Sequence, residues 1–245
     1  MRRKRLSLGL FAAAMMLGFA ASAGAVDGVI EINQAIVNAA GGCPYSIANA
    51  GTYRLTGNLS CGSGKSGILV NASAVTIDLN GFQILGSGGA GTFGINVPNA
   101  GGGVTLVENG SVEGFGTGIS LQGNSAVKNV RALFNTNAGI AMASDGLVED
   151  CIASANNQTT GVGISCGGGC NIWGNTASNN NVGIASGGGS LILRNTLESN
   201  NATALSITGA ANATTGYGEN VLSFNATNVS GGTSLKNNVC SGVLC

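Results

Sequence analysis

The sequence predicts an all-β fold, a parallel β-solenoid of about seven or eight coils, and three observations lead to it. The dipeptide Gly-Ile recurs at 67, 94, 118, 139, 163 and 183, and Ala204-Leu205 continues the series. An Asn or Asp closes an apolar segment once every 20 to 29 residues. No segment keeps apolar residues at helical spacing, and the short period is that of strands. Repeats of this length with Gly and Asn corners are typical of stacked coils.

The first 25 residues predict a secretory signal peptide. Four basic residues precede an apolar stretch from Leu6 to about Ala21, and Ala23-Gly24-Ala25 offers a cleavage site. The stretch is short and rich in Ala and Gly for a membrane-spanning anchor. We therefore expect an exported protein, in the bacterial periplasm, at the cell surface or outside the cell, with no membrane span after cleavage.

Composition beyond residue 25 limits the partners. Four of the ten basic residues lie in the leader, so six basic and ten acidic residues remain, a net charge of −4. This balance gives no electrostatic footprint for nucleic acid. The abundance of Val, Ile and Leu with few charges argues against disorder.

Residues 26–66 are expected to form an N-terminal cap. Within "VIEINQAIVNAA" (29–40), Ile32, Ile36 and Ala39 share one helical face and predict a short lid over the first coil. The stretch "CGSGKSG" (61–67) resembles the end of a phosphate-binding loop, but the first glycine of that motif would fall on Leu59 and no helix follows. Lys65 is therefore expected on a flexible turn, with no bound nucleotide.

The solenoid proper is predicted over 67–239, with an asparagine ladder at one corner. Asn tolerates left-handed backbone angles, and stacked Asn side chains can bond one another. Aligned on this residue, the expected ladder is Asn80, Asn109, Asn129, Asp150, Asn175, Asn195 and Asn220. Two residues before it, an inward column is expected at Val107, Val127, Val148, Trp173 and Leu193. One residue after it, a second inward column is expected at Val130, Cys151, Thr176, Thr196 and Val221.

Six of the seven cysteines are expected to pair, as is usual in exported proteins. Proximity in sequence pairs Cys43 with Cys61 in the cap, Cys166 with Cys170 across one corner, and Cys240 with Cys245 in a C-terminal tail of residues 240–245. Cys151 remains as a buried free thiol. "CGGGC" could also suggest a metal site, but two thiols without any histidine make a poor zinc cage.

The runs "GILVNASAVTIDLNGFQILG", "ENGSVEGFGTGI", "AVKNVRALFNTNAGI" and "LVEDCIASANN" resemble the right-handed parallel β-helix repeats of secreted bacterial proteins. These repeats belong to the superfamily that shares the pectin-lyase fold, and the resemblance covers about 67–239. It implies a right-handed coil and an association with extracellular polysaccharide. Lyases, hydrolases, epimerases and adhesins share the fold, and none of their catalytic motifs maps onto this chain.

One charge cluster is the candidate catalytic site. The column before the Asn corner is expected to face solvent and places Glu108, Lys128 and Glu149 on successive coils, with Asp150 and Arg131 beside them. A lyase would use Lys128 or Arg131 as the base and the carboxylates to hold calcium. The alternative is a cross-coil stack of opposite charges, which the alternation of signs favours. No other cofactor is expected.

The sequence thus predicts an exported, structural, adhesive or carbohydrate-contacting rod, whose partner is an extracellular polysaccharide or a cell-surface component. A polysaccharide lyase or glycoside hydrolase is the alternative. With Trp173 and Tyr217 assigned to inward columns, few aromatic rings remain for stacking on sugars, so tight sugar binding is not expected.

Overall fold

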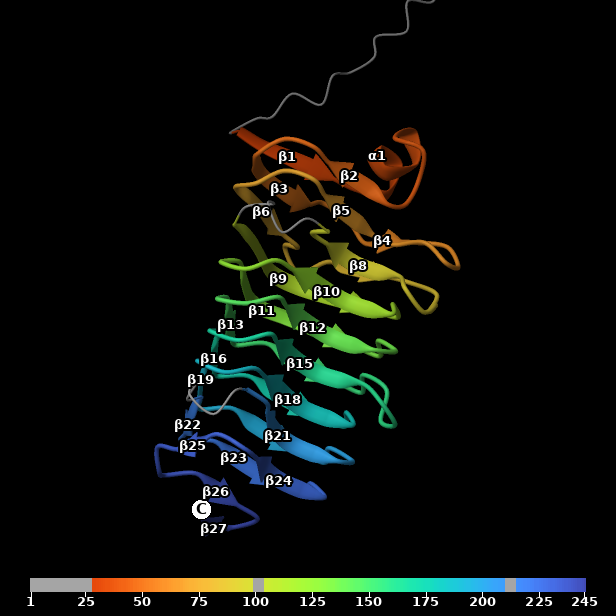
Figure 1. Ribbon diagram of the computed structural model, residues 1–245. Coiled ribbons are helices and arrows are strands. Elements are labelled where there is room, and N and C mark those ends of the chain that lie inside the picture. The colour runs from red at the N-terminus through yellow and green to blue at the C-terminus, as the bar shows by residue number, and fades with distance from the viewer. Residues whose placement is uncertain (1–27, 99–103, 210–214) are drawn as a thin grey trace, which may run out of the picture.

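The computed structural model describes residues 28–98, 104–209 and 215–245, and the predicted leader lies outside them. These residues form a parallel β-solenoid of about eight turns with one short helix. Each full coil contributes one strand to a nine-stranded sheet and two strands, or one long bent strand, to an 18-stranded sheet. Figure 1 shows the coils stacked into a rod, which confirms the predicted solenoid.

Sheet B, the nine-stranded sheet, holds the Gly-Ile repeats, and its strands pair in parallel from one coil to the next. Its strands are β2 (Tyr45–Ile47), β5 (Ile68–Val70), β8 (Phe93–Asn96), β10 (Thr117–Leu121), β12 (Ala138–Met142), β15 (Val162–Cys166), β18 (Val182–Ser186), β21 (Thr203–Ile207) and β24 (Thr227–Ser230).

Sheet A, the 18-stranded sheet, bends at the Asn corner into two halves. The first half holds β1 (Val29–Ile32), β3 (Gly51–Leu55), β6 (Val75–Asp78), β13 (Leu147–Glu149), β16 (Asn171–Trp173), β19 (Leu191–Leu193), β22 (Gly216–Gly218) and β25 (Thr233–Ser234). The second half holds β4 (Leu59–Ser60), β7 (Gln83–Leu85), β14 (Ile152–Ser154), β17 (Thr176–Ser178), β20 (Thr196–Glu198), β23 (Val221–Ser223), β26 (Val239–Cys240) and β27 (Val243–Leu244). Strands β9 (Thr105–Glu113) and β11 (Ala126–Leu133) run through the corner without a break.

The N-terminal segment differs in part from the expected lid. Val29–Ile32 form β1, which pairs with β3, and α1 covers only Gln34–Ala39 beside β2 (Figure 1). Asn33 caps the helix by accepting a hydrogen bond from the Ile36 N–H at 3.1 Å. The helix buries Val37 rather than Ile36 or Ala39. Strands β1 to β4 of the expected cap segment therefore already belong to the two sheets.

Stacked apolar side chains fill the coil. The repeated isoleucine forms one buried column, namely Ile68, Ile95, Ile119, Ile140, Ile164, Ile184 and Leu205. The glycine before it leaves no room for a side chain, because a Cβ on Gly163 would lie 2.6 Å from the Gly183 carbonyl oxygen. The Gly-Ile repeat thus reports a tight interior position.

The three disulfides pair Cys43 with Cys61, Cys166 with Cys170, and Cys240 with Cys245, and Cys151 is a buried free thiol. These are the pairs predicted from proximity in sequence. In the described part of the chain, no helix has the length and hydrophobicity to cross a membrane.

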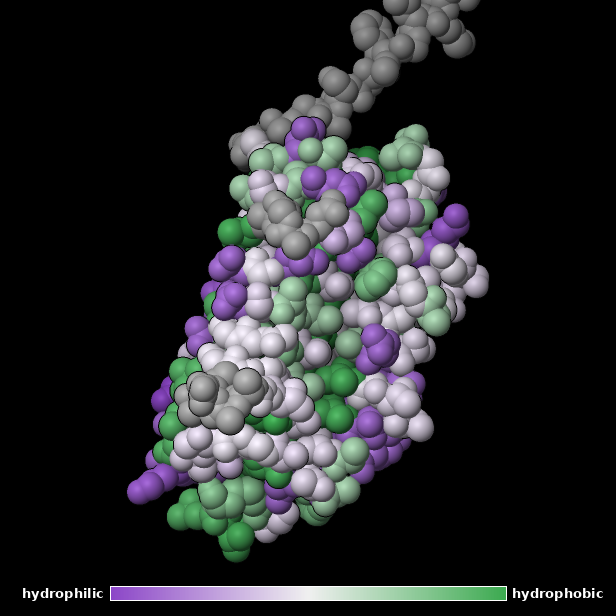
Figure 2. Space-filling model, viewed as in Figure 1, coloured by the Kyte–Doolittle hydropathy of each residue, from purple (hydrophilic) through white to green (hydrophobic). Residues whose placement is uncertain are grey.

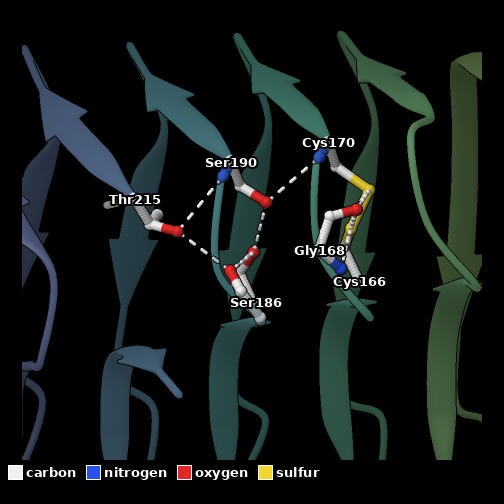
Figure 3. The surroundings of a disulfide bond; sticks show 7 residues. Cys166, Gly168, Cys170, Ser186, Ser190 and Thr215 are labelled. Atoms are coloured by element: carbon white, nitrogen blue, oxygen red, sulfur yellow. Dashed lines mark hydrogen bonds between the residues drawn. A yellow bond between two sulfur atoms is a disulfide. The ribbon is translucent and has the colours of Figure 1, made fainter. Parts of the chain in front are cut away.

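The Cys166–Cys170 disulfide occupies an interior position that other coils fill differently (Figure 3). In the coil before it, the corresponding residues are Met142 and Gly146, and a Cβ on Gly146 would lie 2.6 Å from the methionine sulfur. In the coil after it, Ser186 and Ser190 share a hydrogen bond of 2.8 Å. One corner position is therefore closed by packing, by a covalent bond or by a hydrogen bond in successive coils.

Candidate functional site

Two asparagine ladders stabilise the interior, and the first corrects the expected register. Asn175, Asn195 and Asn220 are buried and align with Cys151 and Val130, one residue past the position expected for them. Each Oδ1 accepts the backbone N–H of the preceding coil, for example from Asn175 to Asn195 at 2.9 Å. The series from Cys151 to Asn238 closes with Asn220 donating to Asn238.

The second interior ladder was not predicted. It lies at the corner before sheet B and consists of Asn135, Asn156, Asn180, Asn200 and Asn225. A second Asn stands shortly before several Gly-Ile or equivalent dipeptides, as in "FNTNAGI" and "SNNNVGI", and this recurrence is the signal that could have revealed it.

The exposed corner column contains other residues than the expected ladder. Its members have left-handed backbone angles and are Asn109, Asn129, Asp150, Gly174, Arg194, Glu219 and Asn237. Only Asn109 and Asn129 continue an exposed ladder, with Asn129 Nδ2 donating to Asn109 Oδ1 at 3.1 Å and Asn109 Nδ2 donating to Asp78 Oδ1 at 3.2 Å. Asn80 lies on a wider turn and donates to the Leu55 carbonyl instead.

The one-residue shift moves several side chains between the interior and the surface. Ile172 and Ile192, not Trp173 and Leu193, continue the buried column of Val107, Val127 and Val148. Thr176, Thr196 and Val221 leave the inward column for the same reason and lie half-buried or exposed, while Leu79, expected at the surface, is buried. Trp173 is 37% exposed and follows Glu149 in the outer column.

The predicted charge cluster divides between two surfaces. Glu108, Lys128 and Glu149 lie in register on the outer face of the first half of sheet A. Lys128 Nζ lies 2.9 Å from Glu149 Oε2. The hydrogen bond and charge of Glu149, with smaller contributions from Glu108 and Asp150, raise the pKa of Lys128. A raised pKa keeps the amine protonated, which works against a role as general base.

Arg131 and Asp150 instead line an open depression at the corner, here called the corner groove. Its volume is about 370 Å³, and it is lined by Gly81, Asn109, Gly110, Ser111, Asn129, Val130, Arg131, Asp150 and Ile152. Within the described residues, neither the Arg131 guanidinium nor the Asp150 carboxylate has a hydrogen bond or ion pair. Both groups are therefore available to a ligand.

The exposed ladder stops inside the corner groove for a chemical reason. Each Asn donates its Nδ2 toward the preceding coil, so the Oδ1 of Asn129 points toward the coil of Asp150. An ionised carboxylate accepts hydrogen bonds but donates none. The next coil therefore cannot continue the ladder, and two acceptors meet where a donor is needed.

An apolar depression lies beside the corner groove on the next coils. This tryptophan patch has a volume of about 270 Å³ and is lined by Leu147, Asn171, Trp173, Leu191 and Leu193. The Arg194 guanidinium lies 5.9 Å from the centre of the Trp173 ring and is held by Glu219 at 2.7 Å. The Asp150 N–H donates to the Trp173 carbonyl at 3.2 Å, so the two depressions adjoin.

The site offers no convergent set of metal ligands. Among the described residues, no group of three or more His, Cys, Asp or Glu side chains is placed to hold a metal ion. The carboxylates of the cluster are spread along the coils, and one of them pairs with Lys128. The arrangement favours hydrogen bonding to a neutral or weakly charged ligand along the rod.

Comparisons with known proteins add little on function. No family model matches the chain, and no curated protein matches it. A solved structure described as "Crystal structure of Agl-KA catalytic domain" is similar at 16% identity and a TM-score of 0.43, over 77% of this chain and 43% of that one. This chain thus spans less than half the length of that neighbour, and the similarity informs neither the site nor the function.

Proposed function

We propose that this protein is an exported β-solenoid that binds an extracellular polysaccharide along the corner groove and does not cleave it. The observation that carries the proposal is the break in the exposed ladder, where Asn129 and Asp150 present acceptors beside the unpaired donor Arg131. Sugar hydroxyl groups both donate and accept, so one ring can satisfy the acceptors and the guanidinium together.

The exposed position of Trp173 supports the proposal. The expectation of weak sugar binding rested on an inward Trp173, and the ring lies at the surface beside the groove. An aromatic face contributes apolar contact area with few rotatable bonds. The groove and the tryptophan patch together span coils from Gly81 to Leu193, long enough for several sugar units of an extended polymer.

Binding is tested by titrating soluble uronate and neutral polysaccharides into the purified protein. We expect Arg131→Ala to weaken binding about tenfold, since hydrogen bonds to a charged group are worth more than neutral ones. Trp173→Ala should weaken it several-fold. Lys65→Ala and Phe224→Ala are matched controls, because each removes an exposed side chain of similar kind outside the two depressions.

The same samples test the catalytic alternative. New reducing ends or unsaturated sugars, formed by the wild type and lost in Lys128→Ala or Asp150→Asn, would show a hydrolase or lyase instead. The lyase would also require calcium for turnover. Absence of binding to every polymer would refute the proposal.

A further inference from the structure

The two sheets end differently at the C-terminal end of the solenoid. Sheet A is closed by the chain itself, because β27 folds back antiparallel on β26 and the Cys240–Cys245 disulfide holds this hairpin. Sheet B ends at β24, which among the described strands pairs with β21 alone. Figure 1 shows β24 near the lower end of the rod with no further strand of its sheet beyond it. One sheet is left with an open edge.

The open edge holds backbone groups without a neighbour. Val229 is the last member of the column that begins at Tyr45 and runs through the repeated isoleucines. The Tyr45 N–H donates to the Gly67 carbonyl of the following coil at 2.8 Å, so the N–H of Val229 points to where a following coil would lie. Beside it, the buried Oδ1 of Asn228 has no hydrogen-bond partner within the described residues.

Nothing on β24 protects this edge from pairing. Its sequence Thr-Asn-Val-Ser contains two β-branched residues and neither the lysine nor the proline that often protects an exposed edge. Residues 220–245 contain a single charged side chain, Lys236, so two such ends can approach with little charge repulsion.

Exposed apolar side chains accompany the open edge. The last coils expose Phe224 (79%), Leu235 (52%), Val243 (67%) and Leu244 (78%). Figure 2 shows hydrophobic surface gathered at the lower end of the molecule. Covering this surface would add apolar burial to the backbone hydrogen bonds.

We propose that this end is a homodimer interface, in which β24 of one copy pairs antiparallel with β24 of a second copy. A two-fold axis at Val229 makes the pairing self-complementary, because the N–H of each Val229 can donate to the carbonyl of the other. Sheet B would then continue across both copies. The proposal does not depend on carbohydrate binding, since the corner groove lies on earlier coils.

Sedimentation of the full protein between about 1 and 100 µM tests the dimer. Val229→Pro removes an N–H that has no acceptor within the chain, and proline is tolerated on an edge strand at such a position. We expect the dimer dissociation constant to rise about tenfold or more. Ser230→Lys should also weaken the dimer through like charges. Ser165→Lys, in the same column of sheet B but on an inner coil, is the matched control and should leave the dimer intact.

A cross-link tests the two-fold axis directly. With Val229→Cys, mild oxidation should double the mass on a non-reducing gel, because only a residue on the axis meets its own copy. Ser230→Cys lies opposite Asn228 of the other copy and should cross-link poorly. Circular dichroism confirms that each variant folds. A wild type that stays monomeric at the highest concentration, a dimer unaffected by both Val229→Pro and Ser230→Lys, or open-ended polymers would each overturn the proposal.

Discussion

At the scale of single residues, the same amino acid performs two tasks in this protein. Asn at the exposed corner supplies a left-handed backbone angle, as at Asn109 and Asn129. Asn one residue later supplies a buried side chain that bonds backbone groups of both neighbouring coils, as at Asn195. Because burial makes an unmet hydrogen bond expensive, the two positions should differ in their energetic weight.

We predict that Asn195→Ala destabilises the protein by about 3 kcal/mol or more, because it leaves buried groups of Asn175 and Asn220 and the Ile172 carbonyl without partners. Asn129→Ala, the exposed control, should cost about 1 kcal/mol or less. Urea denaturation of both variants measures the difference. Equal losses would mean that the interior ladder contributes no more than the exposed one.

This double use of Asn explains which part of the site could be predicted. The Gly-Ile and Val columns fixed the coil because apolar periodicity is specific, whereas Asn fits both a turn and a ladder. The alignment therefore slipped by one residue after Asp150 and placed Trp173 inside. The signal against the slip was the β-branched series Val107, Val127, Val148, Ile172 and Ile192, which continues only in the observed register.

Cys151 gives the interior a pH-dependent group. Burial raises the pKa of this thiol to about 12, from an ordinary value of 9.0. The folded state thus holds the proton more tightly than the unfolded state, so the contribution is full below about pH 9 and is lost as pH rises toward 12. We predict that stability falls above pH 9 by up to about 1.4 kcal/mol per pH unit more in the wild type than in Cys151→Ala. Denaturation curves at pH 8 and pH 10 give the difference, and parallel losses in the two proteins would contradict it.

At the scale of elements, cross-coil charge pairs hold the outer face of sheet A without specifying it. Arg54 with Asp78 and Lys128 with Glu149 connect neighbouring strands, and their side chains are partly exposed. Exposed pairs contribute little, since solvent screens them and ordering two long side chains costs entropy.

We therefore predict that Lys128→Ala costs less than about 1 kcal/mol and that added salt shrinks this loss. Denaturation at low and high ionic strength measures it. Lys65→Ala, which removes an exposed lysine without an ion pair among the described residues, is the control and should change neither value. A large loss that salt does not reduce would indicate a buried role for Lys128.

The disulfides also act within single elements, and loop length separates their effects. Cys166 and Cys170 are four residues apart, whereas Cys43 and Cys61 are 18 apart. The chain-entropy model gives about 2 kcal/mol for the first and about 3 kcal/mol for the second. We expect replacement of Cys166 and Cys170 by serine to cost about 2 kcal/mol at most, because the next coil already accommodates a hydrogen-bonded serine pair there. A complete loss of folding would show that the corner needs the covalent bond.

At the scale of the whole molecule, stability depends on what covers the two ends. Each coil buries its interior against its neighbours, so a solenoid is nearly one-dimensional and frays where a neighbour is missing. The N-terminal end has α1 and Val37, while the C-terminal end has a disulfide hairpin over sheet A and nothing over sheet B. Opening should therefore begin at β24 and proceed toward the middle coils.

Hydrogen exchange tests this order. At sub-micromolar concentration, where any dimer would be dissociated, amides of β24 should exchange first, those of β21 next, and those of β10, β12 and β15 last. Replacing Cys240 and Cys245 by serine should speed exchange in β23 and β26 while leaving β10 unchanged, because the hairpin supports only the adjacent coils. Uniform exchange along the rod would mean that the solenoid opens as one unit. The C-terminal hairpin would then contribute to the stability of every coil rather than to its neighbours alone.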